Sequence, residues 1–226
     1  MVCTESTFGK MLHGDYMENK LIVITASGER LIKTSVDGLQ VSFSGTGNSV
    51  TVYEGTDFHK CQIICGSGTN IHIGKTRHHV KHMIIAGRRA TNAVVRIGDN
   101  FSCVGCQINM NESGSVYIGN DCMFSFGITI WTSDGHTMFD NDTLECLNQG
   151  KDVIIGNHVW VGYHVNLMKG SVVSDNSVVG ACSVVVKHFN DTNVAIGGVP
   201  AKVLRHNINW SRQSPENYMK RTNEMT

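Results

Sequence analysis

The chain has 226 residues, with 19 basic and 19 acidic side chains and a formal net charge of zero. This balance gives no support to a general nucleic-acid-binding or anionic-membrane-binding surface, and no stretch approaches the ~20 apolar residues of a membrane span. The length suits one domain, and the 24 glycines against 2 prolines suit a chain with many tight corners, where a positive φ is often needed.

The N-terminal part is predicted to be rich in β-strands. The opening residues, MVCTESTFGKMLHGDY, contain no basic region followed by an apolar run, so we expect no signal peptide and a cytoplasmic protein. The stretches NKLIVITASGERLI and LQVSFSGTGNSVTVYEG alternate apolar and polar residues and break at Gly and Asn. We assign residues 1–70 to β-rich coils that lead into the main domain.

A six-residue spacing of aliphatic and aromatic residues organises the following segment. An α-helix has a period of 3.6 and a plain strand a period of 2, so neither explains the spacing. A hexapeptide repeat is typical of a parallel β-helix, which we predict over residues 71–203 with the repeated side chains pointing inward. These residues are Ile118, Phe124, Ile130, Ile155, Val161, Leu167, Val173, Val179 and Val185.

Two stretches interrupt the spacing. Residues 76–92, TRHHVKHMIIAGRRATN, are basic; they are interpreted as a protruding solvated loop or as a surface for an anionic acceptor such as a sialylated chain. Residues 131–151 are polar and are tied to a coil at both ends, which favours a functional loop. Beyond Lys187 a closing coil and turn is expected, and residues 204–226 form a tail that becomes a short helix or frays.

The eight cysteines are interpreted as reduced packing residues. Cys103-x-x-Cys106 is a single pair without a matching second pair, so the zinc signal is weak and we expect no metal. Cys103 falls on the six-residue spacing, and Cys122 and Cys182 occupy positions where coils take a small residue.

Two motifs, IGNHVWVG and GGVPAKV, resemble those of the hexapeptide-repeat acyltransferases. The resemblance implies an all-β, left-handed parallel β-helix, a homotrimer and acetyl-CoA as co-substrate. The loop sequence TSDGHTMFDNDTLECLNQGK is similar to that of acetyltransferases from capsule and O-antigen loci, the sialic acid and polysialic acid O-acetyltransferases among them. The galactoside and maltose acetyltransferases have an asparagine that helps to hold the acetyl donor, whereas FSCVGCQIN offers Cys or Val at that place.

His136 is the candidate general base. Transfer of an acetyl group to a hydroxyl needs a base that removes the alcohol proton, and a neutral imidazole suits that role. The resemblance matches His136 to the catalytic histidine of the family. Either Asp134 or Glu145 is a candidate to orient the imidazole. Trp160 is the sixth residue of its hexapeptide and should point outward, as a binding surface or a subunit contact; the resemblance places it beside acetyl-CoA.

The resemblance also supplies candidate contacts for coenzyme A. Lys202 and Arg205 are two cations three residues apart at an expected turn, which suits phosphate groups, although ordinary solvated charge is the alternative. The remaining candidates match positions along the pantetheine arm and near its far end. They are Trp160, Tyr163, Ala181, Val186 and Lys187.

The sequence therefore predicts acetyl-CoA-dependent O-acetylation of a sugar hydroxyl on a surface polysaccharide or its precursor, with sialic acid and polysialic acid among the acceptors. An N-acetyltransferase of an amino-sugar nucleotide and a catalytically silent scaffold are alternatives. Another is a γ-class carbonic-anhydrase-like zinc enzyme on the same fold, which would need three converging histidines. The candidates for that set are His72, His78 or His79, and His82.

Overall fold

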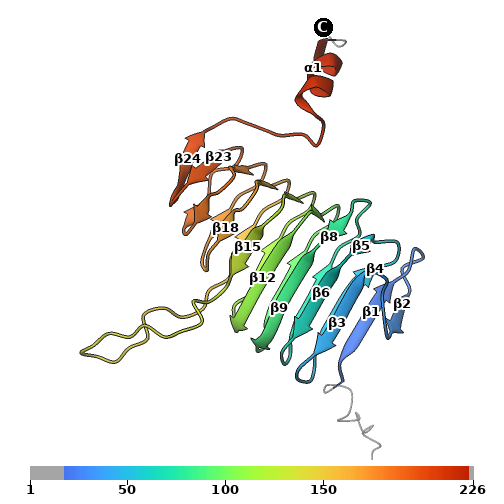
Figure 1. Ribbon diagram of the computed structural model, residues 1–226, viewed down its shortest axis with the longest axis vertical. Helices are drawn as coiled ribbons and strands as arrows, with labels where there is room; N and C mark the ends of the chain where they lie inside the picture. The colour runs from blue at the N-terminus through green and yellow to red at the C-terminus, as the bar shows by residue number, and fades with distance from the viewer. Residues whose placement is uncertain (1–17, 224–226) are drawn as a thin grey trace, which may run out of the picture.

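The structure, a computed structural model, describes residues 18–223. Figure 1 shows one elongated solenoid, with a long loop projecting from one side and a helix beyond the last coils. The predicted absence of a signal peptide concerns residues that lie outside the described ones, and so does Cys3. The predicted boundary after residue 70 stays a prediction; the parallel pairing runs from β4 (Ser49–Tyr53) to β7 (Asn70–Ile73) across it.

The chain passes in turn through three sheets, here numbered 1 to 3, and nearly all neighbouring strands are parallel. Sheet 1 contains β2 (Arg30–Lys33), β1 (Lys20–Ile24), β4, β7, β10 (Val94–Ile97), β13 (Val116–Ile118), β16 (Val153–Ile155), β19 (Val172–Val173) and β22 (His188–Phe189). Sheet 2 contains β24 (Ala201–Arg205), β23 (Ala195–Gly198), β20 (Val178–Val179), β17 (Trp160–Val161), β14 (Met123–Phe124), β11 (Ser102–Cys103), β8 (Val80–Lys81) and β5 (Phe58–His59). Sheet 3 contains β21 (Val184–Val185), β18 (Asn166–Leu167), β15 (Ile128–Trp131), β12 (Cys106–Glu112), β9 (Met83–Ala90), β6 (Cys61–Cys65) and β3 (Leu39–Phe43).

The core confirms the predicted β-helix and its phase. All residues on the six-residue spacing are at most 3% exposed, and they stack in register from coil to coil. In sheet 1, for example, Val173 pairs with Ile155 on one side and with Phe189 on the other. Burial of each such side chain contributes roughly 1.5–3 kcal/mol, so the column offsets the entropy lost by ordering many short strands.

Coil length changes along the solenoid, and this corrects the interpretation of residues 76–92. Coils of eighteen residues, as between Ile155 and Val173, are confined to the C-terminal part. Earlier coils are longer: Leu39 pairs with Cys61, for instance. The basic stretch is part of such a longer coil rather than a protruding loop, because it contains β8 and the eight-residue strand β9. In MIIAG, the first five residues of β9, buried and partly exposed positions alternate as they do along a strand.

Gly156 and Gly162, at the start of two coil corners, allow the next coil to approach the backbone closely, and neither has a positive φ. A Cβ on Gly156 would lie 2.2 Å from Asp175 Oδ1 of the next coil, and one on Gly162 would lie 2.8 Å from the Val179 carbonyl oxygen. The positive-φ positions that follow are filled by other residues. Among them are His158, His164, Asn176 and Cys182. Glycine does adopt positive φ elsewhere, as at Gly127 and Gly170, so it shares these corner conformations with other residue types.

Most of the described cysteines pack as expected. Cys61, Cys65, Cys103, Cys106 and Cys122 are buried, free thiols. Burial raises the pKa of Cys65, Cys103 and Cys122 to about 12, so these thiols are protonated and unreactive near neutral pH. The packing interpretation is wrong for Cys146, on the projecting loop, and Cys182, at a coil corner, because both are exposed.

The C-terminal tail forms helix α1 (Pro215–Asn223). Ser214 caps it, with its hydroxyl accepting a hydrogen bond from Asn217 N at 3.3 Å, and proline occupies the first turn. Arg212 ties the preceding segment to earlier coils through Asp121 at 3.2 Å and the Ser102 hydroxyl at 2.7 Å. Between residues 18 and 223, no helix combines the length and the apolar character needed to span a bilayer.

Candidate functional site

The loop that carries His136 is an ordered hairpin. It leaves sheet 3 after β15, reaches away from the solenoid, and returns at β16 (Figure 1). Leu147 N donates to the Met138 carbonyl oxygen at 2.8 Å, and Asp140 N donates to the Glu145 carbonyl oxygen at 2.9 Å. This hairpin extends the loop as a defined arm, here called the His136 arm (residues 132–151).

Asp134 anchors the base of the His136 arm. Its carboxylate accepts from Lys169 Nζ at 2.5 Å and from Asn148 Nδ2 at 2.8 Å, and the same Asn148 amide donates to the His136 carbonyl oxygen at 2.8 Å. The hydrogen bond from Lys169, and then that from Asn148, lowers the pKa of Asp134. The contact between Asp134 and Lys169 therefore stabilises the fold fully at pH values above the ordinary pKa of an aspartate. This stabilisation is lost as the pH falls through the lowered pKa of Asp134.

The His136 imidazole itself is solvent-exposed. Within the described part of the chain, no hydrogen bond or ion pair reaches this ring. Asp134 is held by Lys169 and Asn148, and no hydrogen bond joins the Glu145 carboxylate to the ring in this range. In the single chain neither predicted carboxylate orients the imidazole; Asp134 instead fixes the backbone that carries it.

Trp160 points outward from β17, as predicted, and the residue is 39% exposed. Its ring centroid lies 6.2 Å from that of Trp210, which stacks on His158 at 4.3 Å. With α1, the rings of Trp160 and Trp210 border a cavity of about 630 Å³. Trp160 belongs to sheet 2, whereas the His136 arm leaves sheet 3.

The predicted pantetheine contacts occupy two corners of the C-terminal coils. Tyr163 and Ala181 lie at the corner after sheet 2, where Cys182 N donates to the Tyr163 carbonyl oxygen at 2.7 Å. Val186 and Lys187 follow β21 at the next corner, beyond sheet 3. All four side chains are exposed, and the short strands β18 and β21 separate the two pairs.

Lys202 and Arg205 lie on a strand rather than at the expected turn. Both belong to β24, which pairs antiparallel with β23. Lys202 lies opposite Gly197 and Arg205 opposite Ala195, because a register shift adds one residue to β24 between them. Gly197 and Ala195 are two residues apart on one strand, so the shift places the two exposed cations on the same face. The structure thus keeps the pair together by a different local geometry.

The histidines considered for a zinc site do not converge within one chain. His72 lies on sheet 1, His79 pairs with Asp57, and the ring of His82 meets that of His59 edge-on at 5.8 Å. Over residues 18–223 no group of three or more His, Cys, Asp or Glu side chains has an arrangement that could hold a metal ion.

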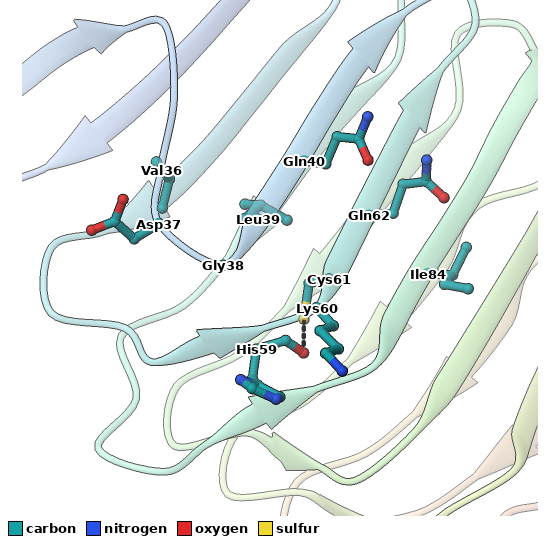
Figure 2. Close-up of a pocket in the computed structure, with 10 residues that line it drawn as sticks. All are labelled: Val36, Asp37, Gly38, Leu39, Gln40, His59, Lys60, Cys61, Gln62 and Ile84. Atoms are coloured by element: carbon teal, nitrogen blue, oxygen red, sulfur yellow. Dashed lines mark hydrogen bonds between the residues drawn. The ribbon is translucent and has the colours of Figure 1, made fainter.

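A cavity of about 690 Å³ lies on the N-terminal coils (Figure 2). Gln40 and Gln62 project side by side from β3 and β6, and the thiol of Cys61 donates to the His59 carbonyl oxygen at 3.6 Å. Burial raises the pKa of that thiol, which makes it a poor nucleophile. None of the predicted site residues lines this cavity, so its size does not identify it as the reaction centre.

Sequence reasoning missed Lys169 and Asn148, which hold the base of the His136 arm. Lys169 lies 35 residues beyond Asp134, and it meets the arm because the next coil returns past the same corner. A lone lysine between coils has no spacing signal. Once the six-residue phase is known, the stacking of one coil on the next could have indicated that Lys169 lies beside the arm.

Comparisons with known proteins agree with this architecture. No family model matches the sequence. A polysialic acid O-acetyltransferase of Neisseria meningitidis is 34% identical over 171 residues, which are 74% of this chain and 78% of the relative. A polysialic acid O-acetyltransferase of Escherichia coli O1:K1 is 36% identical over 129 residues, 57% of this chain but only 38% of the relative.

The fold has a matching solved structure as well. The crystal structure of the polySia-specific acetyltransferase NeuO has a TM-score of 0.54, with 23% identity, and the alignment covers 92% of this chain and 99% of that one. This likeness in fold supports the left-handed winding. The meningococcal relative matches about three quarters of both chains, and the structure has the hexapeptide coils. The chain therefore belongs to the family of hexapeptide-repeat sugar O-acetyltransferases.

Proposed function

We propose that the chain transfers an acetyl group from acetyl-CoA to a hydroxyl of a surface polysaccharide or its precursor, with sialic acid and polysialic acid as the first acceptors to test. The observation that carries this proposal is the exposed His136, held on an ordered arm in a chain related to the polysialic acid O-acetyltransferases. The proposal includes the cytoplasm as the place of reaction, where acetyl-CoA is made.

The proposed chemistry is direct transfer. The neutral His136 imidazole takes the proton of the sugar hydroxyl while the hydroxyl oxygen attacks the thioester carbonyl carbon. A tetrahedral intermediate forms, the carbon–sulfur bond breaks, and the imidazolium returns the proton to the departing coenzyme A sulfur. Holding donor and acceptor together supplies much of the rate, and Trp160 is proposed to pack against the donor.

The site is proposed to lie between subunits of a homotrimer. His136 and Trp160 belong to different sheets of one chain, and a neighbouring chain is proposed to bring them into one site. The His136 arm also exposes four apolar side chains, each more than half accessible, which a partner surface would remove from water. They are Met138, Phe139, Leu144 and Leu147. A head-to-tail contact that closes after three copies satisfies these requirements with identical interfaces.

The trimer predicts a specific result. Analytical ultracentrifugation should give a species of three chains, and Phe139→Asp should shift it toward monomer and lower activity, because a charge among the exposed apolar side chains of the arm opposes docking. Asp142→Asn, at an exposed position in the same hairpin, is the matched control and should leave assembly intact. A stable wild-type monomer with full activity would remove the shared site from the proposal.

The cation pair on β24 is proposed to bind coenzyme A phosphates. Lys202→Glu and Arg205→Glu should each raise KM for acetyl-CoA about tenfold or more, since a charge-assisted hydrogen bond contributes about 1.5–3 kcal/mol. The loss should be smaller with the dephospho form of the donor. Lys33→Glu, an exposed cation on β2, is the control. Equal losses with both donors would show that the pair does not read the 3′-phosphate.

The proposed function is tested with a panel of acceptors and acetyl-CoA, following release of free thiol. Sialic acid, polysialic acid, neutral glycosides and an amino-sugar nucleotide should be compared, with the acetylated product identified by mass spectrometry. We expect an O-acetylated sugar. Thiol release only with the amino-sugar nucleotide would favour the N-acetyltransferase, and no acceptor-dependent release would refute acetyl transfer.

A further inference from the structure

A bulge in β9 turns two arginines outward beside the base of the His136 arm. Buried and outward residues alternate along β9 up to Gly87, but Arg88 and Arg89 are then exposed in succession. The pairing shows the cause: Ala86 lies opposite Asn109 and Arg89 opposite Asn111, so β9 carries one extra residue against β12. Bulges re-aim side chains in this way and recur next to active sites.

The two arginines border a cavity of about 310 Å³ on the outer face of sheet 3, here called the β9 pocket. Its walls come from three consecutive strands and one residue of β6. They are Ile64, Ala86, Arg88, Arg89, Asn109, Asn111 and Trp131. The pocket therefore combines cations, amides and an indole in a small volume.

Asn109 gives the β9 pocket an unused hydrogen-bond donor. The side chain is 8% exposed, and its Oδ1 accepts from Gln107 Nε2 at 2.8 Å, which fixes the amide. Its Nδ2 has no hydrogen-bond partner in the described range. Leaving a buried polar group unpaired is unfavourable, so a ligand acceptor at this position would satisfy the Asn109 amide.

The charge of the β9 pocket is not neutralised by the chain. Across residues 18–223, neither Arg88 nor Arg89 forms an ion pair with a carboxylate. Asp134, at the base of the arm, is already held by Lys169. Two adjacent guanidinium groups without a carboxylate partner favour an anionic ligand, and their planar donor groups match a carboxylate or a phosphate.

The β9 pocket adjoins the segment that carries His136. Asn109 pairs with Trp131, the last residue before the arm, and its carbonyl oxygen accepts from Thr132 N at 3.2 Å. A Cβ built on Gly135 would lie 3.7 Å from Asn111 Nδ2. The pocket wall thus continues into the residue that precedes His136, so a molecule held there lies beside the arm.

We propose that the β9 pocket binds the carboxylate-bearing ring of an acidic sugar acceptor. Arg88 and Arg89 would pair with the carboxylate, Asn109 Nδ2 would donate to a ring substituent oxygen, and the Trp131 indole would pack against the apolar face of the sugar. This inference rests on the proposed function and assigns its acceptor class to named residues. The competing anion is a phosphate of the donor, and the test separates the two.

The test measures binding to the full-length chain without acetyl-CoA, by titration followed by NMR. Methyl α-sialoside should bind at least tenfold tighter than its C1 amide, and the double change Arg88→Ala with Arg89→Ala should abolish that difference. Arg30→Ala with Arg96→Ala, two exposed arginines on sheet 1, is the matched control and should preserve it. Asn109→Leu should weaken both ligands, and melting curves verify folding.

Coenzyme A binding is measured on the same variants. Its Kd should not change in the Arg88/Arg89 variant; a loss there with unchanged sialoside binding would assign the arginines to the donor phosphates and overturn the proposal. Equal wild-type binding of sialoside and amide would overturn it too. Arginine-dependent sialoside binding without acetyl transfer would refute the proposed function but support the role of the β9 pocket. Acetyl transfer that is unaffected by the arginine changes would support the proposed function but refute the role of the β9 pocket.

Discussion

Replacing His136 by alanine should lower kcat by about 10²–10⁴-fold, the usual contribution of a positioned general base. The side chain is exposed and, in the described range, makes no hydrogen bond that holds the arm, so the melting temperature and the Kd for coenzyme A should barely change. Some turnover should remain, because holding donor and acceptor together still accelerates the reaction.

The measurement should be made on an acceptor whose acetylated product has been verified. Thr137→Ala, at the next exposed position of the same arm, is the matched control and should keep a nearly normal kcat. A normal kcat in the His136→Ala variant would exclude His136 as the base.

Val173→Asp should destabilise the fold severely. Val173 is 1% exposed and lies between Ile155 and Phe189 in the column of sheet 1. A carboxylate at this position has no partner, and its burial costs several kcal/mol in addition to the lost apolar contacts. A loss of this size is a large part of the 5–15 kcal/mol that stabilises a typical domain.

We expect the Val173→Asp chain to aggregate or to melt roughly 10 °C lower, since 1 kcal/mol corresponds to about 2–4 °C for a chain of this length. Val104→Asp makes the same substitution at an exposed corner and should have a small effect. Calorimetry or thermal fluorescence compares the two. An unchanged melting temperature for Val173→Asp would mean that the side chain is not in the column.

Sequence reasoning obtained the column and its phase because the same physical requirement recurs every six residues. It misread the stretch that contains β9, where a longer coil and a bulge break the spacing and place two arginines outward in succession. It also did not indicate that His158 and His164 adopt positive φ at coil corners. Local deviations of this kind follow from how successive coils contact one another, which spacing within one coil does not encode.

The sequence predicted the candidate site as a set of residues, which stays a prediction, and it did not predict how they are arranged. His136 was indicated by its loop and its resemblance, and Trp160 by its outward phase. The role of Asp134 differed from the prediction because Lys169, a residue of the next coil, holds its carboxylate. The proposed pairing of His136 with Trp160 involves a second copy of the chain, and a single sequence carries little information about such a geometry.

The His136 arm interrupts the solenoid without disturbing its register. Ile118 still pairs with Ile155, although they are 37 positions apart instead of the eighteen of a regular coil. Loop-closure entropy grows only with the logarithm of length, so this doubling costs about 0.6 kcal/mol. Insertions at this corner are therefore thermodynamically inexpensive, and one rigid scaffold can carry arms of different length and reach. Acceptor choice could thus diversify in evolution while the coils that provide stability stay unchanged.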